Sequence, residues 1–139
     1  MQTALFKKTA VLMEQNAVQC SLYKDTLIAS GFDVSVAKTP LEGLLQIKEK
    51  PCDLMVINVE IAEESFLEKL IHKMQCEKAT KFMPIIGLSI YDKENKKNML
   101  KNLDAFLIKP ISIDRFIETV QVCIEKKHDD SQNPSDKRL

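Results

Sequence analysis

The segment Leu54-Met55-Val56-Ile57-Asn58-Val59 decides the fold, because it is almost entirely apolar and lies between the acids Asp53 and Glu60. A short continuous apolar run of this kind predicts a strand that is buried on both faces. Four similar runs occur along the chain: Thr9 to Met13, Asp33 to Ala37, Pro84 to Leu88 and Ala105 to Ile108. Segments with helical periodicity separate them. The pattern predicts five βα units around a parallel sheet in one α/β domain.

Each predicted strand is followed by a predicted helix with recognisable end signals. The first helix, Ala17 to Ala29, ends before Gly31, which can adopt a left-handed conformation. The second begins at Thr39-Pro40-Leu41-Glu42, where Thr39 caps, Pro40 suits the first turn and Glu42 completes a capping box. The third, Ser65 to Cys76, has an apolar stripe, Phe66, Leu67, Leu70, Ile71 and Met74.

The last third of the chain predicts two more helices and a tail. A fourth helix, Asp92 to Leu103, has few apolar residues and is expected to be the loosest. A fifth begins at a Ser112 cap and ends at about Lys126. From Lys127 the apolar residues stop until Leu139, so we expect a domain over residues 1–126 and a disordered tail over 127–139.

Composition excludes several classes of function. The 139 residues fit one domain, and no stretch approaches the roughly 20 apolar residues of a membrane span, so a cytoplasmic protein is expected. Lys and Arg balance Asp and Glu at 20 each, which disfavours nucleic-acid binding. The four cysteines, Cys20, Cys52, Cys76 and Cys123, lack metal-ligand spacing, so we expect free buried thiols and no metal or other cofactor.

Polar residues follow four of the predicted strands. They are Glu14-Gln15-Asn16, Asn58 with Glu60, Ser89 and Lys109. In an open parallel sheet the functional site lies beyond the carboxyl ends of the strands. We therefore expect these side chains to meet at one edge of the sheet.

Four segments resemble the receiver domains of bacterial two-component response regulators. They are Leu12 to Asn16, Asp53 to Asn58, Pro84 to Ser89 and Phe106 to Pro110, within a resemblance that covers about Lys8 to Glu125. Ala29 to Phe32 and Lys109 to Thr119 look more like the DivK group of single-domain cell-cycle regulators. The resemblance implies a (βα)5 flavodoxin-like, doubly wound sheet with strand order 2-1-3-4-5.

The resemblance also implies where a phosphorylation site would lie, and this sequence departs from it. In the family the third strand ends in an aspartate that accepts phosphate, and two acids after the first strand hold Mg²⁺. The matching residues here are Asn58, Glu14 and Gln15. An amide cannot act as the nucleophile, and one remaining acid is a poor magnesium site. Ser89 matches the family's hydroxyl residue, and Phe106 stands at its aromatic switch position.

Lys109 matches the family's lysine, and we expect it to form a buried ion pair with Glu14 in a nearly neutral pocket. Glu60 lies two residues past Asn58, in the following loop, and is not expected to replace the missing acceptor.

These observations predict a pseudo-receiver, a binding module and not an enzyme, which acts without phosphorylation. Expected partners are a histidine kinase, a phosphotransferase, an output regulator or a second copy of the chain. The predicted partner face comprises Ile90, Tyr91, Phe106, Ile108 and Ile111. Two alternatives stay open: a receiver that still responds to phosphodonor or metal by another route, and a small flavodoxin-like ligand binder. The absence of a glycine-rich phosphate loop disfavours the second.

Overall fold

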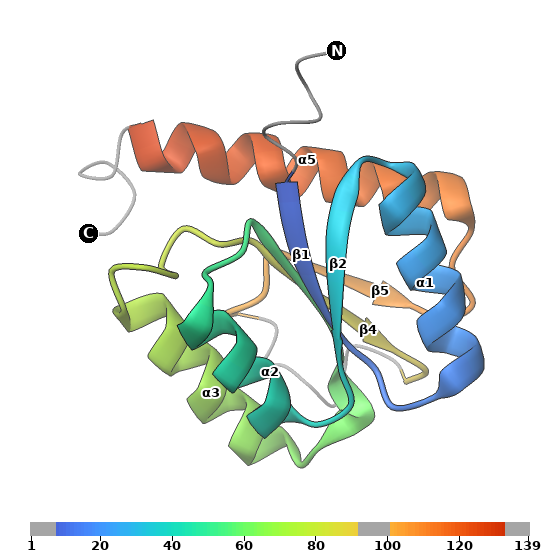
Figure 1. The fold of residues 1–139 in the computed structure, drawn as a ribbon, viewed down its shortest axis with the longest axis horizontal. Helices are drawn as coiled ribbons and strands as arrows, with labels where there is room; N and C mark the ends of the chain where they lie inside the picture. Colours follow the sequence, from blue (N-terminus) through green and yellow to red (C-terminus); the bar gives the residue numbers. More distant parts are fainter. Residues whose placement is uncertain (1–7, 92–100, 133–139) are drawn as a thin grey trace.

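The computed structural model describes residues 8–91 and 101–132, which form one parallel five-stranded sheet (Figure 1). The strand order is β2-β1-β3-β4-β5, as the resemblance implies. The strands are β1 (Lys8–Met13), β2 (Phe32–Ala37), β3 (Leu54–Asn58), β4 (Ile85–Ser89) and β5 (Ala105–Ile108). The helices are α1 (Ala17–Ala29), α2 (Pro40–Glu49), α3 (Glu64–Cys76) and α5 (Ile113–Gln132). All five predicted strands are confirmed within one residue at either end.

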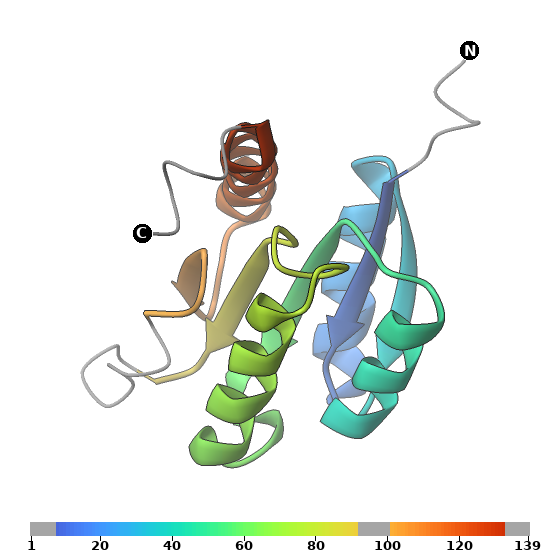
Figure 2. The same cartoon turned by 90° about the vertical axis from the view of Figure 1, so that its left-hand side faces the viewer.

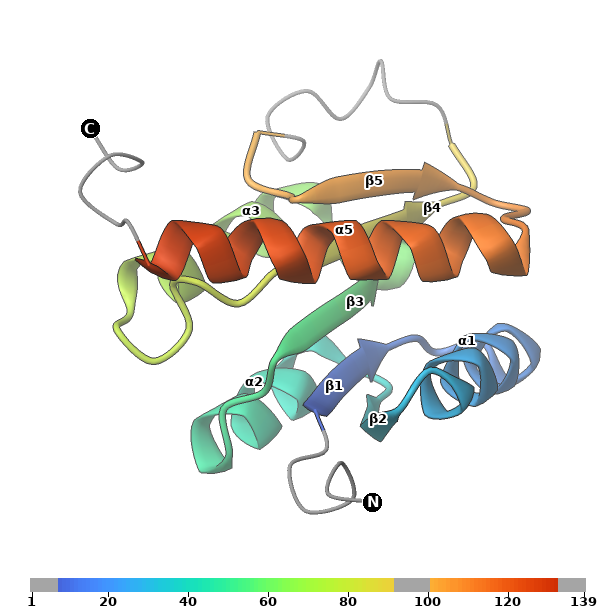
Figure 3. The same ribbon diagram turned by 90° about the horizontal axis from the view of Figure 1, so that it is seen from above.

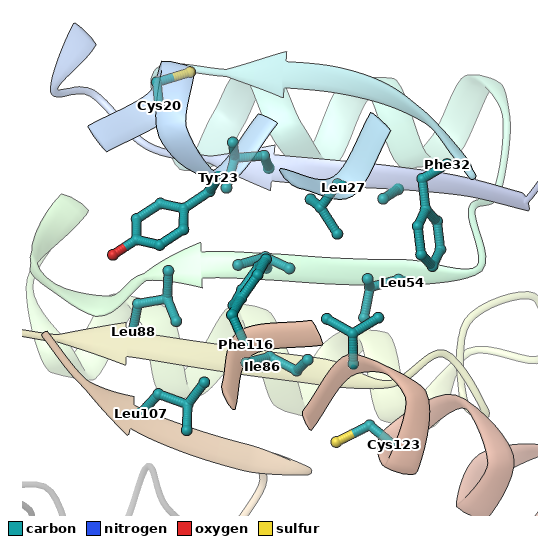
Figure 4. Packing of buried hydrophobic residues seen from close by; sticks show 14 residues of the cluster. Cys20, Tyr23, Leu27, Phe32, Leu54, Ile86, Leu88, Leu107, Phe116 and Cys123 are labelled. Atoms are coloured by element: carbon teal, nitrogen blue, oxygen red, sulfur yellow. The ribbon is translucent and has the colours of Figure 1, made fainter. Parts of the chain in front are cut away.

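The helices cover both faces of the sheet. Helices α2 and α3 lie on one face, and α1 and α5 lie on the other (Figures 2 and 3). Alternate residues of the central strands point to opposite faces, so two hydrophobic clusters form. One joins the sheet to α1 and α5, with Tyr23 and Phe116 tilted against each other at 5.3 Å between ring centroids (Figure 4). The other joins the sheet to α2 and α3. All five residues of β3 are buried, as a strand covered on both faces requires.

The predicted helix ends are formed by the expected side chains. Thr39 Oγ1 accepts a hydrogen bond from Glu42 N, and Glu42 returns by accepting one from Lys38 N. Gly31 has a φ of 101°, which only glycine adopts readily. Ser112 Oγ accepts from Arg115 N at the start of α5. These caps stabilise the turns that bring each helix back over the sheet.

Two expectations about the helices are wrong or untested. Phe66 does not pack in the core and is 49% exposed, because the buried stripe of α3 runs through Leu67, Leu70, Ile71 and Met74. Phe66 is in the first turn of α3 and lies about 90° around the helix from the centre of that stripe. Most of the predicted fourth helix, residues 92–100, lies outside the described residues. Residues 101–103 that follow are not helical.

The predicted domain boundary after residue 126 is wrong, because α5 continues to Gln132. Lys127, expected to begin a disordered tail, is 7% exposed, and its Nζ lies 3.3 Å from Asp104 Oδ1. Asp104 Oδ2 accepts a hydrogen bond from Ile85 N, so one carboxylate joins the last turns of α5 to the start of β4. Residues 133–139 lie outside the described residues. Across the described ranges, no helix is both long and apolar enough to cross a membrane.

Candidate functional site

The carboxyl ends of β1, β3, β4 and β5 bring the predicted polar residues together. An open pocket of about 570 Å³ is lined by Glu14, Gln15, Asn58 and Lys109, as the sequence predicts. Asn16 caps α1 by accepting a hydrogen bond from Gln19 N, and this turn holds Glu14 and Gln15 at the pocket. The parallel register aligns β1 with β3 and β3 with β4, so their polar ends lie at the same edge.

Glu14 is the centre of the hydrogen-bond network. Its side chain is fully buried, and Oε1 lies 3.1 Å from Lys109 Nζ. Glu14 Oε2 accepts from Asn58 Nδ2 at 3.0 Å and from Asn16 N at 3.1 Å. The predicted ion pair between Glu14 and Lys109 is therefore confirmed. A buried carboxylate with three donors is satisfied, which its removal from water requires.

Asn58, the last residue of β3, uses both ends of its amide. Its Nδ2 donates to Glu14 Oε2 and to Gln15 Oε1, the latter at 3.1 Å. Its Oδ1 accepts from Glu60 N at 3.1 Å and so caps the short 3₁₀ turn Val59–Ile61. Two acceptor oxygens face the same nitrogen, so this position needs a donor. An aspartate carboxylate here would place a second anion about 3 Å from Glu14.

Glu60 lines the pocket, although its place in the loop after Asn58 gave it no expected role there. Its Oε2 accepts from Ser89 Oγ at 2.5 Å, and its Oε1 accepts from Ile90 N at 3.1 Å. The expectation of a nearly neutral pocket is therefore wrong: Glu14, Glu60 and Lys109 together carry one net formal negative charge. The Ser89 hydroxyl donates to Glu60, while the Ser89 backbone O accepts from Lys109 N. A sign of this arrangement was available in the sequence, since an asparagine side chain commonly accepts a hydrogen bond from the backbone two residues on, which here is Glu60 N.

Lys109 contacts more than its carboxylate partner. Its Nζ lies 5.8 Å from the Tyr23 ring centroid, and its backbone N donates to Ser89 O at 2.7 Å. The peptide bond to Pro110 is cis. Burial, with a smaller contribution from the Glu14 carboxylate, raises the pKa of Tyr23. Tyr23 and its neighbours Gln19 and Leu22 bring α1 into the pocket wall, a contribution that the strand-end pattern does not reveal.

The predicted partner face is only partly exposed. Ile90, Tyr91 and Ile108 are 58%, 55% and 44% exposed. Phe106 packs against the α2 and α3 cluster, and Ile111 packs against the α1 and α5 cluster. Three of the five residues are therefore available on the surface, and the other two support the core.

The cysteines are free thiols, as predicted, but not all are buried. Cys20 and Cys123 are buried, Cys52 is half-buried and Cys76 is exposed. Burial raises the pKa of the Cys52 and Cys123 thiols to about 11. The described residues contain no cluster of three metal-ligating side chains.

No protein-family model matches the chain, but individual proteins do. The chain is 26% identical to the polar-differentiation response regulator DivK of Brucella ovis, a match that covers 82% of this chain and 94% of DivK. A response regulator from Thermotoga maritima is 25% identical with a TM-score of 0.73, over 86% of this chain and 98% of that one. A CheY-like receiver domain from Methanospirillum hungatei has a TM-score of 0.77 at 20% identity, over 89% and 98% of the two chains.

The strand order, the pocket at the strand ends and these similarities point to one class: the chain has the fold of response-regulator receiver domains and resembles them in sequence. Within that class it is DivK-like, since the match to DivK extends over almost the whole relative.

Proposed function

We propose that this chain is a receiver domain that accepts no phosphoryl group and acts by binding a signalling protein. The observation that carries the proposal is the amide of Asn58, which donates to Glu14 and Gln15 at the end of β3. By its resemblance to receivers, this is the position of the phosphate acceptor. An amide nitrogen has no free lone pair with which to attack phosphorus, so the acyl-phosphate step has no nucleophile.

Neither carboxylate of the pocket replaces the acceptor. Glu14 is fully buried and accepts from Lys109, Asn58 and Asn16. Glu60 accepts from Ser89 and Ile90. Attack by either group would require those hydrogen bonds to break, and each charge-assisted bond of this kind contributes about 1.5–3 kcal/mol.

The pocket is also a poor magnesium site. Mg²⁺ needs near-octahedral oxygen ligands and is usually held by one or two carboxylates together with water and substrate phosphate. Both carboxylates of the pocket already accept hydrogen bonds from the protein, Glu14 from Asn58 and Glu60 from Ser89. Asn58 Nδ2 already occupies the space between the Glu14 and Gln15 oxygens. A metal there would have to displace the amide and compete with the Lys109 ammonium.

The partners follow from the class. Receiver domains bind histidine kinases, phosphotransferases and output regulators, and we propose such a protein as the partner. The exposed residues Ile90, Tyr91 and Ile108 beside the pocket are the surface that we assign to it.

Intact-mass analysis after incubation with acetyl phosphate and Mg²⁺ tests the loss of phosphorylation, with a phosphorylatable receiver as the positive control. We expect no added phosphoryl group. A phosphoryl group mapped to Asn58 or Glu60 would overturn the proposal and favour a receiver that responds by another route. Deamidation of Asn58 creates an acceptor, so each sample must first be checked for that conversion.

Affinity capture from the source cell, with and without phosphodonor and Mg²⁺, tests the binding role. We expect the same partner in both conditions and its loss with Tyr91→Asp and Ile108→Asp. Leu41→Asp is the matched control, because Leu41 is 62% exposed on α2, a helix on the opposite face from α5. Capture that requires the phosphodonor would contradict the proposal.

A further inference from the structure

We infer that Glu60 acts as an internal ligand of the pocket. Its carboxylate occupies an anion-binding site formed by the Ser89 hydroxyl and the Ile90 amide at the end of β4, and it thereby holds Ile90 and Tyr91 in one arrangement. The inference rests on the proposed function, because it describes how a receiver without phosphate would hold one conformation. The groups concerned are the Glu60 carboxylate, the Ser89 hydroxyl and the backbone amides of Ile90 and Tyr91.

The contacts of Glu60 are those of a bound anion. Each carboxylate oxygen receives a different donor, the Ser89 hydroxyl at Oε2 and the Ile90 amide at Oε1. Ser89 is fully buried, so its hydroxyl needs a partner within the protein. Two donors from consecutive residues, aimed at one anion, make a binding site for a carboxylate or another oxyanion.

Asn58 positions Glu60 next to these donors. The side-chain oxygen of Asn58 accepts from Glu60 N at 3.1 Å, and the 3₁₀ turn Val59–Ile61 follows directly. Val59 is 1% exposed and anchors this turn in the core. Asn58 therefore both closes the Glu14 network and positions the backbone of Glu60.

The hydrogen bonds continue from Glu60 to the exposed surface. The single proton of the Ser89 hydroxyl is donated to Glu60, so the oxygen is oriented to accept from Tyr91 N, at 2.9 Å. Lys109 N donates to Ser89 O and ties the same residue to β5. Ile90 and Tyr91 are more than half exposed. Glu60 is therefore a positioning residue for the surface that we assign to the partner.

An external oxyanion must displace Glu60 to reach Ser89 and Ile90, which gives a direct test with inorganic phosphate. In the Glu60→Ala variant the donors are released, and only the paired charges of Glu14 and Lys109 remain in the pocket. We expect phosphate to shift the Ile90 amide resonance saturably in Glu60→Ala. The parent should bind at least about tenfold more weakly, since one charge-assisted hydrogen bond alone is worth that factor.

Two further variants define the origin of that shift. Adding Ser89→Ala to Glu60→Ala should abolish the phosphate response. Glu63→Ala is the matched control, since Glu63 is an exposed acid whose side chain makes no capping hydrogen bond to α3, and it should behave as the parent does. Equal phosphate binding by the parent and Glu60→Ala, or none by Glu60→Ala, would overturn the inference.

A double-mutant cycle supplies an independent measurement. If Glu60 and Ser89 act as a pair, the losses of unfolding free energy in Glu60→Gln and Ser89→Ala will not add up to the loss in the double variant. Additive losses would overturn the inference and leave the proposed function standing. Phosphoryl transfer to Asn58 would overturn the proposed function, whereas it would leave the coupling between Glu60 and Ser89 unchanged. The two failures are therefore distinguishable.

Discussion

Replacement of Glu14 by Gln tests the buried ion pair, because the change keeps the shape of the side chain and removes its charge. The Glu14 oxygens accept from three donors, namely Lys109 Nζ, Asn58 Nδ2 and Asn16 N. Glutamine has one acceptor oxygen and adds an NH₂ group. Either Lys109 loses its acceptor, or the two donors at Oε2 face another donor.

The expected loss of stability is large for a single isosteric change. Removing one partner of a buried pair costs about 3–5 kcal/mol, since the other charge is stranded. Three features reduce this loss: the Lys109 side chain keeps 9% of its surface exposed, the glutamine keeps one acceptor oxygen, and the Glu60 carboxylate lies in the same pocket. We therefore expect the lower end of the range, about 3 kcal/mol. For a domain of this size, that corresponds to a melting temperature lower by roughly 10 °C.

Equilibrium urea unfolding followed by circular dichroism measures this loss. With a slope of about 2 kcal/mol per molar urea, we expect the midpoint to fall by roughly 1.5 M. Glu118→Gln, at an exposed position of α5, is the control and should lie within about 0.5 kcal/mol of the parent. Glu14→Gln combined with Lys109→Met should recover most of the loss, since both charges are then absent. A Glu14→Gln variant as stable as the parent would refute the reasoning.

Three other changes have expected outcomes. Burial raises the thiol pKa of Cys52 and Cys123 from 9.0 to about 11, so the folded state holds protons that the unfolded chain releases. The free energy of unfolding should therefore fall as pH rises through that interval, and fall less in Cys123→Ala. Lys127→Met should lower stability by about 2 kcal/mol in urea unfolding, because the Asp104 carboxylate loses its cationic partner while it keeps the hydrogen bond from Ile85 N, and a neutral result would contradict the pairing. Asn58→Asp should also lower stability, and Mg²⁺ should restore part of the loss in thermal melts; unchanged stability would contradict a need for a donor at this position.

The sheet could be predicted because its evidence is local. The run Leu54 to Ile57 is continuous and apolar, and the structure buries every residue of it. Thr39 and Gly31 have side-chain and backbone properties that fix a helix start and a helix end within a few residues. Such signals depend on neighbouring positions only, so one sequence contains them.

The errors arise where a residue's partner is distant in the chain. Lys127 looked like the start of a polar tail, yet it pairs with Asp104, 23 residues earlier. Glu60 looked like a loop residue, yet it bonds to Ser89, 29 residues later. In both cases a charged side chain is partly removed from water because another element supplies its partner. Composition cannot reveal that, since it depends on which elements the fold brings together.

The pairing of Glu14 with Lys109 could be predicted because the resemblance placed both at strand ends, whereas the role of Asn58 could not be read from its type alone. As a substitution for an acid, Asn58 suggests only a lost nucleophile. In the structure its amide donates twice and accepts once, and each bond joins a different part of the pocket. A carboxylate offers no donor, so Glu14 and Gln15 would need a cation to hold them together. Asparagine supplies that function without a metal, and the same side chain turns Glu60 toward Ser89. The amide is thus a structural part of the pocket. The anions, Glu14 and Glu60, and the cation, Lys109, all belong to the chain itself.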